Sequence, residues 1–268
     1  CRQNNFSVNL LTNLTLLSDE ILQVLVSNPL ISVQTSLYSM NEDTHDSITG
    51  LQGSFKKTIQ AIRLLHRHNI PIQINCPIMK QNKDDYSDVI TWAQSMNIEA
   101  DSDYMLFGCY DCSKKNLKCR LSLSEVEAVV TSQCESGAYV DKLFTEASNK
   151  RLDENQPICS VCSASICISN QGNLYPCEGW QGYSVGSILE SSLLDIWRSS
   201  ERVLMLRKLK LGDFPQCVSC DYIRYCSPCL YRNANENSGD FHKVSPYFCK
   251  VAELQKRVVE QEIRKRNN

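Results

Sequence analysis

The chain has 268 residues, with 28 basic against 30 acidic side chains and a formal net charge of −2 at pH 7. This balance gives no positive surface for a nucleic-acid backbone or an anionic membrane, so we expect neither as a partner. A hydrophobic content of 42% is ordinary for a globular protein with a real core. No run approaches the roughly 18 to 20 apolar residues that span a bilayer, and the first residues lack a signal-peptide layout.

Fifteen cysteines are far more than a chain of this length usually carries. Their odd number argues against the fully paired disulfide framework of small secreted proteins, although sequons at Asn5 and Asn13 speak mildly for secretion. The thiols cluster at spacings typical of metal ligands instead of spreading along the chain. We therefore expect reduced thiols and a cytoplasmic protein.

Up to about residue 107, short β-type runs alternate with amphipathic helical runs, as in βαβ units with a parallel sheet. Strands are predicted over residues 6–12, 30–38, 70–79 and 100–107. A helix is predicted over 54–69, where the apolar residues fall on one face. Apolar residues that fall on one helical face also predict helices around Leu22 and Val89. Four consecutive strand–helix units indicate an α/β fold, which is either half of a (β/α) barrel or an open doubly wound sheet.

In both architectures ligands bind at the carboxyl ends of the strands. A small-molecule site is therefore expected at Thr12–Asn13, Ser36–Tyr38 and Asn75–Cys76. From the pattern alone, ordinary strand ends are the simpler interpretation.

The rest of the chain divides into a bridge and a cysteine-rich region. Residues 108–157 begin as a polar loop, and a helix then opens with a capping box from Ser122 to Glu125. From 158 to 268 the periodicity fades, and only 191–209 and 250–266 are predicted to be helical. With so few amphipathic elements, we expect bound metal to hold this region together. The predicted domains are 1–107, 108–157 and 158–268.

The late cysteines follow a regular order, Cys159-x2-Cys162, Cys177, Cys217-x2-Cys220-x5-Cys226-x2-Cys229 and Cys249. Eight thiols suffice for two sites of four, and such tetrads bind either zinc or a cubane iron–sulfur cluster. A zinc-bound structural module without catalysis is therefore an alternative. Gly172 is expected in a tight turn between two short strands, the second of which leads to Cys177.

Two motif groups resemble a known family. Residues 32–75 resemble the middle of a radical S-adenosylmethionine (radical SAM) barrel, with "SLYS" at the family's Ser-Leu-Asp-Gly and "LLTN" at its Thr-Asn-Gly. The Cys-x9-Gly-x4-Cys of Cys162 to Cys177, followed by Cys-x2-Cys-x5-Cys and two further cysteines, is similar to the SPASM extension of peptide and protein maturases. The resemblance implies a partial radical SAM barrel followed by a SPASM domain with two auxiliary 4Fe–4S clusters.

The family pattern also implies which thiols share a cluster. The first cluster would use Cys162, Cys177 and Cys229, with Cys159 as the candidate for its fourth ligand; an open position for substrate is the alternative. The second cluster would use Cys217, Cys220, Cys226 and Cys249. The family usually has three residues between the last two cysteines of the tight group, but this chain has two.

Other residues carry weaker expectations. Cys167 alternates with isoleucines and is expected to pack rather than to bind metal. Cys109, Cys112 and Cys119 are either a polar loop with free thiols or part of a further metal site. Glu178 follows Cys177 directly, and the resemblance implies a catalytic proton acceptor there; an ordinary solvated glutamate is equally consistent with the sequence.

The family starts its chemistry from a Cys-x3-Cys-x2-Cys loop that binds a cluster with one iron free for S-adenosylmethionine. That spacing does not occur in the 268 residues. The chain opens at what resembles the third strand, so the first strands, their loop and a third cluster are expected to lie outside it, and this piece alone to be inactive. Asn13, Ser36 and Asn75 are the cofactor-binding residues implied by position, while Tyr38 replaces the family's aspartate.

The resemblance implies an enzyme that modifies a ribosomally made precursor peptide by hydrogen-atom abstraction. It also implies a reductant such as ferredoxin or flavodoxin as a partner. Which peptide is modified, and whether the product is a thioether, a crosslink, an epimer or an oxidised residue, does not follow from the sequence.

Overall fold

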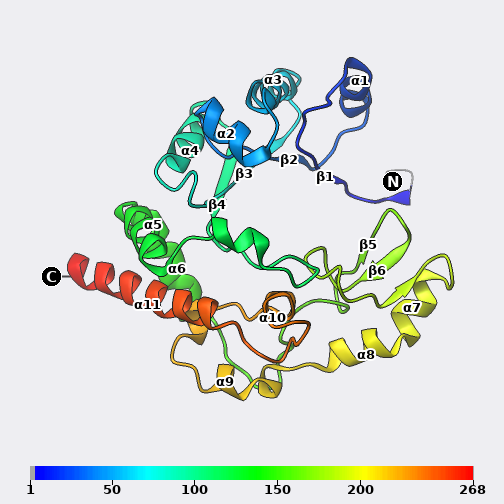
Figure 1. The fold of residues 1–268 in the computed structure, drawn as a ribbon, viewed down its shortest axis with the longest axis vertical. Coiled ribbons are helices and arrows are strands. Elements are labelled where there is room, and N and C mark those ends of the chain that lie inside the picture. Colours follow the sequence, from blue (N-terminus) through cyan, green and yellow to red (C-terminus); the bar gives the residue numbers. More distant parts are fainter. Residues whose placement is uncertain (1–3, 268) are drawn as a thin grey trace. The chain divides into compact units, whose positions relative to one another are not determined.

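The computed structural model describes residues 4–267, and its contacts divide the chain into two units. One unit holds the residues up to Leu106 together with Cys119–Leu121, and the other holds Phe107–Lys118 and the chain from Ser122 onward. Figure 1 shows the elements of both units. The finer division at 107 and 157 stays a prediction.

The first unit is built on a four-stranded parallel sheet in the order β1-β2-β3-β4. The strands are β1 (Asn9–Leu11), β2 (Ser32–Ser36), β3 (Ile72–Pro77) and β4 (Glu99–Asp103), and the helices are α1 (Asp19–Ser27), α2 (Glu42–Thr49), α3 (Ser54–Arg67) and α4 (Tyr86–Ser95). The predicted alternation of strands and helices is confirmed, although all four strands are shorter than expected. Helix α2 was not predicted, because its sequence "EDTHDSIT" has almost no apolar face.

Alternation along the central strands gives the sheet one apolar and one polar face. Val33, Ile72 and Ile74 are buried on the first, which packs with Ile62 and Leu65 of α3. Each such side chain contributes about 1.5 to 3 kcal/mol when fully buried. The half-buried polar residues alternate with them and point to the opposite face: Gln34, Ser36, Gln73 and Asn75.

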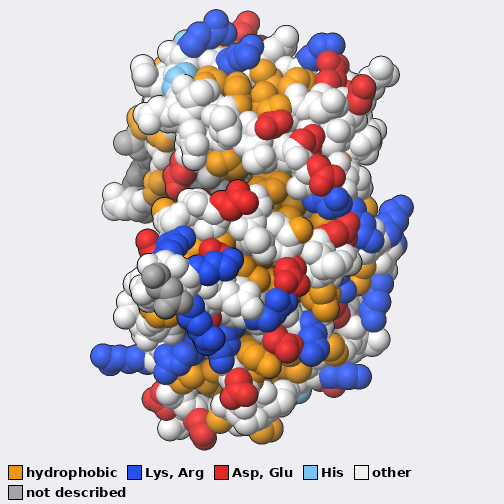
Figure 2. Space-filling view, turned by 90° about the vertical axis from the view of Figure 1, so that its left-hand side faces the viewer, with side chains coloured by type: hydrophobic (Ala, Val, Ile, Leu, Met, Phe, Trp, Pro, Cys, Tyr) orange, Lys and Arg blue, Asp and Glu red, His pale blue; other side chains and the backbone are white. Residues whose placement is uncertain are grey.

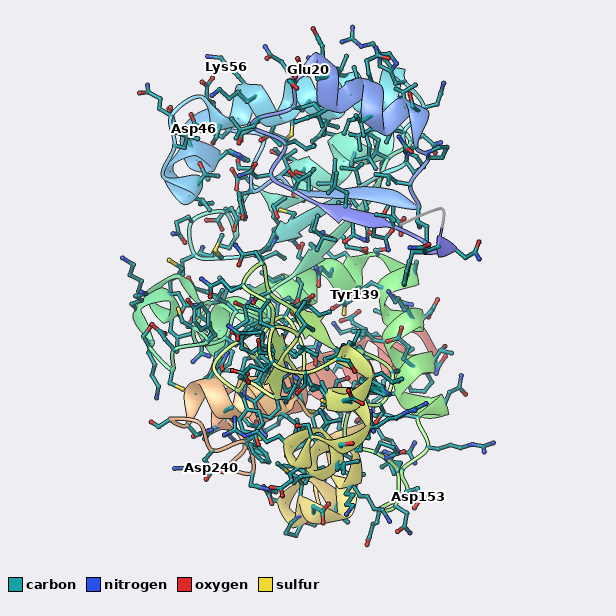
Figure 3. All side chains as sticks on the ribbon, turned by 90° about the vertical axis from the view of Figure 1, so that its right-hand side faces the viewer. Glu20, Asp46, Lys56, Tyr139, Asp153 and Asp240 are labelled. Atoms are coloured by element: carbon teal, nitrogen blue, oxygen red, sulfur yellow. The ribbon has the colours of Figure 1, made fainter. Side chains whose placement is uncertain are left out.

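A carboxylate fixes the junction between α2 and α3. Asp46 accepts hydrogen bonds from the backbone N–H groups of Gly53 and Phe55 and from the Ser54 hydroxyl, the last two at 2.8 Å. Gly53 has φ +79°, a left-handed conformation that glycine adopts at little cost. Figure 3 labels Asp46 on α2 and Lys56 on α3, and Lys56 forms an ion pair with Glu42 at 2.9 Å.

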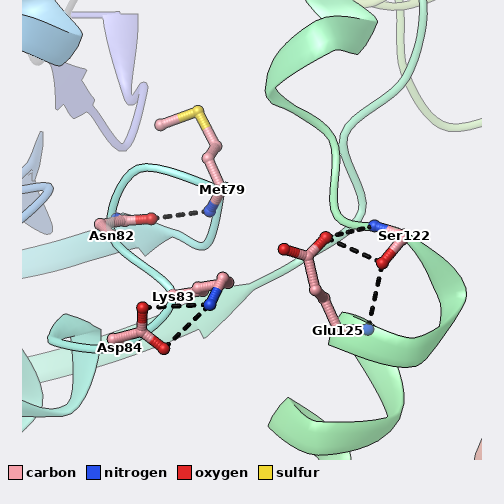
Figure 4. Close-up of polar contacts among 6 residues, drawn as sticks. All are labelled: Met79, Asn82, Lys83, Asp84, Ser122 and Glu125. Carbon is pink, nitrogen blue, oxygen red and sulfur yellow. Dashed lines mark hydrogen bonds and ion pairs between the residues drawn. The ribbon is translucent and has the colours of Figure 1, made fainter.

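A buried amide closes the loop after β3. Asn82 is 1% exposed; its side chain donates to the carbonyls of Tyr38 at 2.6 Å and Pro77 at 3.0 Å, and accepts from the Met79 N–H at 2.7 Å (Figure 4). Because one side chain satisfies three backbone groups, it holds the ends of β2 and β3 together.

The second unit contains three longer helices and a set of short elements. The longer helices are α5 (Leu123–Glu135), α6 (Gly137–Asn149) and α11 (Pro246–Asn267). The predicted capping box is present: the Ser122 hydroxyl accepts the Glu125 N–H, and the Glu125 carboxylate accepts the Ser122 N–H (Figure 4). The short elements are β5 (Cys167–Ile168), β6 (Asn173–Tyr175), β7 (Gly186–Ser187), α7 (Leu193–Ser199), α8 (Glu201–Lys208), α9 (Pro215–Val218), the 3-10 turn η4 (Ile223–Tyr225) and α10 (Leu230–Glu236).

The segment 191–209 is helical as predicted, and it forms two helices, α7 and α8, that meet at Ser200. Ser200 has φ −62° and ψ 122°, and its hydroxyl donates to the Val185 carbonyl at 2.8 Å. This bond holds the residue in an extended conformation that ends α7 and begins α8.

The cysteine-rich region has a hydrophobic core of its own. Trp180 and Phe214 are 3% and 1% exposed and pack in one cluster with Leu174, Val203 and Leu230. Short elements from different parts of the chain therefore share one apolar core. The expectation that bound metal also holds this region together stays a prediction.

The surface mixes both signs of charge. In the face shown by Figure 2, Lys and Arg side chains are interspersed with Asp, Glu and hydrophobic ones. No helix within residues 4–267 combines the length and the apolar character needed to cross a bilayer.

Candidate iron–sulfur site and cofactor pocket

Four thiols of the second unit lie within electrostatic reach of one another. Cys217 is on α9, Cys220 follows that helix, Cys226 follows η4, and Cys249 is on α11. Burial raises the pKa of Cys217 to about 11, and Cys226, Cys249 and Cys220 add to the effect as neighbouring thiols. The Cys226 pKa is raised by burial and by Cys249 and Cys220. We name these four thiols the tight group.

A second set of thiols is linked in the same way. Burial raises the pKa of Cys177 to about 12, with further contributions from Cys229 and Cys159. The pKa of Cys162 rises to about 11 by burial, offset by Arg207 and reinforced by Cys159. The Cys229 thiol in turn interacts with Cys159. We name these four thiols the split group, since Cys229 is far along the chain from the other three.

These electrostatic neighbours are consistent with the grouping that the family pattern implies, which stays a prediction. None of the described cysteines forms a disulfide. Which of them bind metal stays a prediction.

The donor chemistry of both groups fits iron–sulfur clusters. Four thiolates are the usual ligands of a cubane cluster. In residues 4–267 no three His, Cys, Asp or Glu side chains converge closely enough to hold a single ion. A four-iron cube holds its cysteines farther apart than a single ion does. Burial raises the pKa of Cys162, Cys177 and Cys217, so cluster binding must release the protons of these thiols.

Cys162 has an unusual backbone conformation. Its φ is +58°, in the left-handed region that costs a residue with a Cβ about 1 to 2 kcal/mol. Its N–H donates to the Ser165 carbonyl at 2.9 Å, and its own carbonyl accepts a hydrogen bond from Arg207 Nε. The Arg207 guanidinium also lies over the Trp197 ring, 4.3 Å from its centroid. These contacts hold the Cys162 thiol in a fixed direction despite the strain.

The hairpin before Cys177 is formed as predicted. Gly172 has φ +81° in the turn between β5 and β6, where Ser169 and Asn173 close the loop by a 2.9 Å hydrogen bond. Cys167 lies on β5 opposite Tyr175 and is half-buried. Glu178 is exposed, and its charge raises the pKa of Cys167, Cys177 and Tyr231. The carboxylate therefore lies beside the split group and in contact with solvent.

The three remaining cysteines of the polar loop are divided between the units. Cys119 belongs to the first unit, where its sulfur accepts a hydrogen bond from Gln81 at 3.2 Å. Cys109 and Cys112 belong to the second, where Cys112 Sγ donates to the Ala234 carbonyl at 3.7 Å.

A pocket of about 570 Å³ lies at the carboxyl ends of β1 and β2 in the first unit. Its lining includes Asn13, Ser36 and Asn75, all three of the predicted cofactor-binding residues. Ser36 and Asn75 are register partners on neighbouring parallel strands. The walls are rich in hydroxyl and amide groups, with Tyr38 among them, which suits a polar organic ligand.

A buried histidine at this pocket was missed by the sequence reasoning. His45 is 1% exposed, lines the pocket, and accepts the Tyr38 N–H at Nδ1 over 3.3 Å. Burial lowers its pKa, and the neighbouring Asp46 carboxylate partly offsets this. The neutral ring therefore fixes the backbone of Tyr38. No spacing in the sequence marks His45, because its role depends on the turn after β2.

The fold and site define a partial α/β barrel with a polar pocket, joined to a domain with two groups of four cysteines. Residues 1–93 match the model of the Radical SAM superfamily, and residues 159–230 match SPASM, described as an iron–sulfur cluster-binding domain. The chain therefore carries a Radical SAM region and a SPASM domain.

Curated relatives align with most of the chain. It is 25% identical over 264 residues to the AdoMet-dependent heme synthase of Methanosarcina barkeri, covering 90% of this chain and 73% of that protein. It is 26% identical over 243 residues to the antilisterial bacteriocin subtilosin biosynthesis protein AlbA of Bacillus subtilis, covering 86% of this chain and 52% of AlbA. The PqqA peptide cyclase of Granulibacter bethesdensis is 24% identical, and the alignment covers 80% of this chain and 59% of the cyclase.

Solved structures share the fold. The structure "Native anSMEcpe with bound AdoMet" has a TM-score of 0.72 at 16% identity and covers 96% of this chain and 76% of that one. Streptococcus suis SuiB bound to precursor peptide SuiA has a TM-score of 0.65 at 15% identity and covers 93% of this chain and 60% of SuiB.

Proposed function

We propose that this chain belongs to a peptide-modifying radical SAM enzyme that acts by hydrogen-atom abstraction and uses S-adenosylmethionine. The observation that carries the proposal is the division of eight thiols into two groups of four, seven of which lie within the SPASM match at 159–230. Such a pair of groups suits two auxiliary four-iron clusters. When bound, each supplies a one-electron carrier or a coordination position for substrate.

The relatives support a peptide as the substrate. AlbA is named for subtilosin biosynthesis and PqqA peptide cyclase for its peptide, while SuiB was solved with its precursor peptide. A zinc-bound module without catalysis has no support among these matches. We infer that a reductant such as ferredoxin or flavodoxin supplies electrons and that the enzyme works in the cytoplasm.

The chain's own residues have separate tasks in this proposal. Asn13, Ser36 and Asn75 would bind S-adenosylmethionine through hydrogen bonds from the pocket wall. Asn82 and His45 would keep the Tyr38 backbone in place beside it. Glu178 would accept a proton from the substrate, because it is exposed and lies beside the split group.

A tetrapyrrole substrate is the second candidate. The heme synthases of Methanosarcina barkeri and Nitratidesulfovibrio vulgaris align with 90% and 87% of this chain. The two candidates differ in what the protein binds. A tetrapyrrole would give an intense, shifted Soret band on titration, whereas a precursor peptide would leave that region unchanged.

The proposed function is tested with two forms of the protein, the 268-residue chain and the product that its gene encodes. After anaerobic reconstitution the chain should bind about eight irons, four per thiol tetrad. It should form no 5′-deoxyadenosine with dithionite, because it has no Cys-x3-Cys-x2-Cys loop. The gene product should form 5′-deoxyadenosine and change the mass of its peptide. Zinc as the only metal in anaerobically prepared protein would overturn the proposal, as would 5′-deoxyadenosine from the chain alone.

A further inference from the structure

Two basic side chains of the second unit cap each other's helical elements. Lys150 follows the last residue of α6, and Arg224 lies in the 3-10 turn η4. Arg224 Nη1 donates to the carbonyl of Lys150 at 2.6 Å and to that of Ala147 at 3.3 Å. The last carbonyls of a helix have no partner within the helix, and a basic side chain can satisfy them. Arg224 therefore caps the end of α6.

Lys150 makes the reciprocal contacts to η4. Its side chain is half-buried, and its Nζ donates to the Ile223 carbonyl at 3.1 Å and to the Cys226 carbonyl. Hydrogen bonds from a charged donor are stronger than those between neutral groups. One ammonium group thus fixes both carbonyls at the end of η4, where the chain leaves the turn at Cys226.

The same loop is also held from α11. Lys256 Nζ donates to the Asp221 carbonyl at 3.4 Å and lies 5.7 Å from the centroid of the Tyr222 ring. The loop from Cys220 to Cys226 is therefore tied to α11 near its start and to α6 near its end. Because this loop carries two thiols of the tight group, the contacts that fix its backbone also fix where those thiols begin.

We propose that Lys150 and Arg224 are positioning residues for the tight group, so that α6, which lies outside the SPASM match at 159–230, forms part of that site. This inference rests on the proposed function, since it requires a cluster at the tight group. The reciprocal caps hold the Cys226 backbone in one place, and less conformational entropy is then lost when its thiol binds metal.

The test measures how fast each thiol group loses iron to the chelator bathophenanthroline, under anaerobic reducing conditions, in the reconstituted chain. Two backgrounds separate the groups: Cys177→Ala leaves iron at the tight group, and Cys220→Ala leaves it at the split group. Lys150→Met and Lys150→Arg are introduced into both. Lys210→Met is the matched control, because Lys210 Nζ donates to Asn155 Oδ1 at 3.3 Å, outside the loop.

In the Cys177→Ala background, Lys150→Met should raise the rate of iron loss about tenfold, which corresponds to about one hydrogen bond from a charged donor. Lys150→Arg should recover part of this loss, because a guanidinium can also donate to two carbonyls. Arg224→Met should act in the same direction as Lys150→Met. In the Cys220→Ala background Lys150→Met should leave the rate unchanged, and Lys210→Met should have no effect in either background.

A Lys150→Met protein that holds no iron at the tight group but four irons at the split group would support the inference. If Lys150→Met speeds iron loss equally in both backgrounds, its effect is a general loss of the fold and the inference is overturned; unchanged rates in both would overturn it as well, with the proposed function left intact. An unmodified chain that binds no iron would instead contradict the proposed function, so the two failures are distinguishable.

Discussion

Replacing Cys220 by alanine tests whether the eight thiols form two independent tetrads. The chain should hold about eight irons, and Cys220→Ala should lower this to about four, because a cube that loses one of four ligands is labile while the other tetrad is unaffected. Cys220 is an electrostatic neighbour of both Cys217 and Cys249. Iron and sulfide analysis with the visible spectrum measures the loss directly.

Double variants make this prediction sharper. Cys217→Ala with Cys220→Ala removes two ligands of one tetrad, so the iron content should stay at about four. Cys177→Ala with Cys220→Ala removes one ligand from each tetrad, so the content should fall close to zero. The difference follows only from how the thiols are grouped, since both double variants lose two cysteines.

Two further cysteines serve as controls. Cys134 is buried on α5 and Cys167 lies on β5, and neither belongs to a thiol group, so alanine at each should leave about eight irons. Circular dichroism should show native helix content in every variant. A Cys177/Cys220 variant that keeps four irons, or a Cys217/Cys220 variant that loses all of them, would refute the grouping.

Three predictions concern the fold around the sites. Asn82→Ala should lower the free energy of unfolding by about 2 to 4 kcal/mol in a urea titration, because three buried backbone groups lose their partner, whereas Asp84→Ala at an exposed position should have little effect. Gly179→Ala should cost about 1 to 3 kcal/mol in the same assay, because a Cβ would come 2.8 Å from the Tyr231 ring, and Gly137→Ala, with no atom nearer than 3.6 Å, should cost nothing. The pKa of His45 is below its ordinary 6.5 in the folded chain, so its stabilisation is complete above pH 6.5 and lost as the pH falls; His45→Gln should flatten this part of the unfolding profile, and an unchanged slope would contradict the prediction.

The sequence predicts most of the first unit because periodic apolar residues there decide both element type and burial. The face of α3 through Ile59, Ile62 and Leu65 is buried as expected, and the parallel sheet follows from the alternation. Helix α2 escaped prediction since a single buried side chain, His45, and the cap Asn41 support it. A helix that is stabilised by one buried side chain and one cap shows no apolar periodicity in its sequence.

Cysteine spacing predicts which residues belong to the candidate site, but not how their backbone is held. Spacing and resemblance identified the cysteines, but they could not show that Cys162 has a left-handed backbone or that Arg207 holds its carbonyl.

The second unit combines an apolar core with buried thiols. Its core around Trp180 and Phe214 is formed by apolar side chains from short elements. Burial raises the pKa of Cys162 and Cys177, so the deprotonation that metal binding requires costs more free energy there than at an exposed cysteine. Because the same residues lie in or beside the core, circular dichroism has to accompany the iron analysis of each variant, to separate loss of a ligand from loss of the fold.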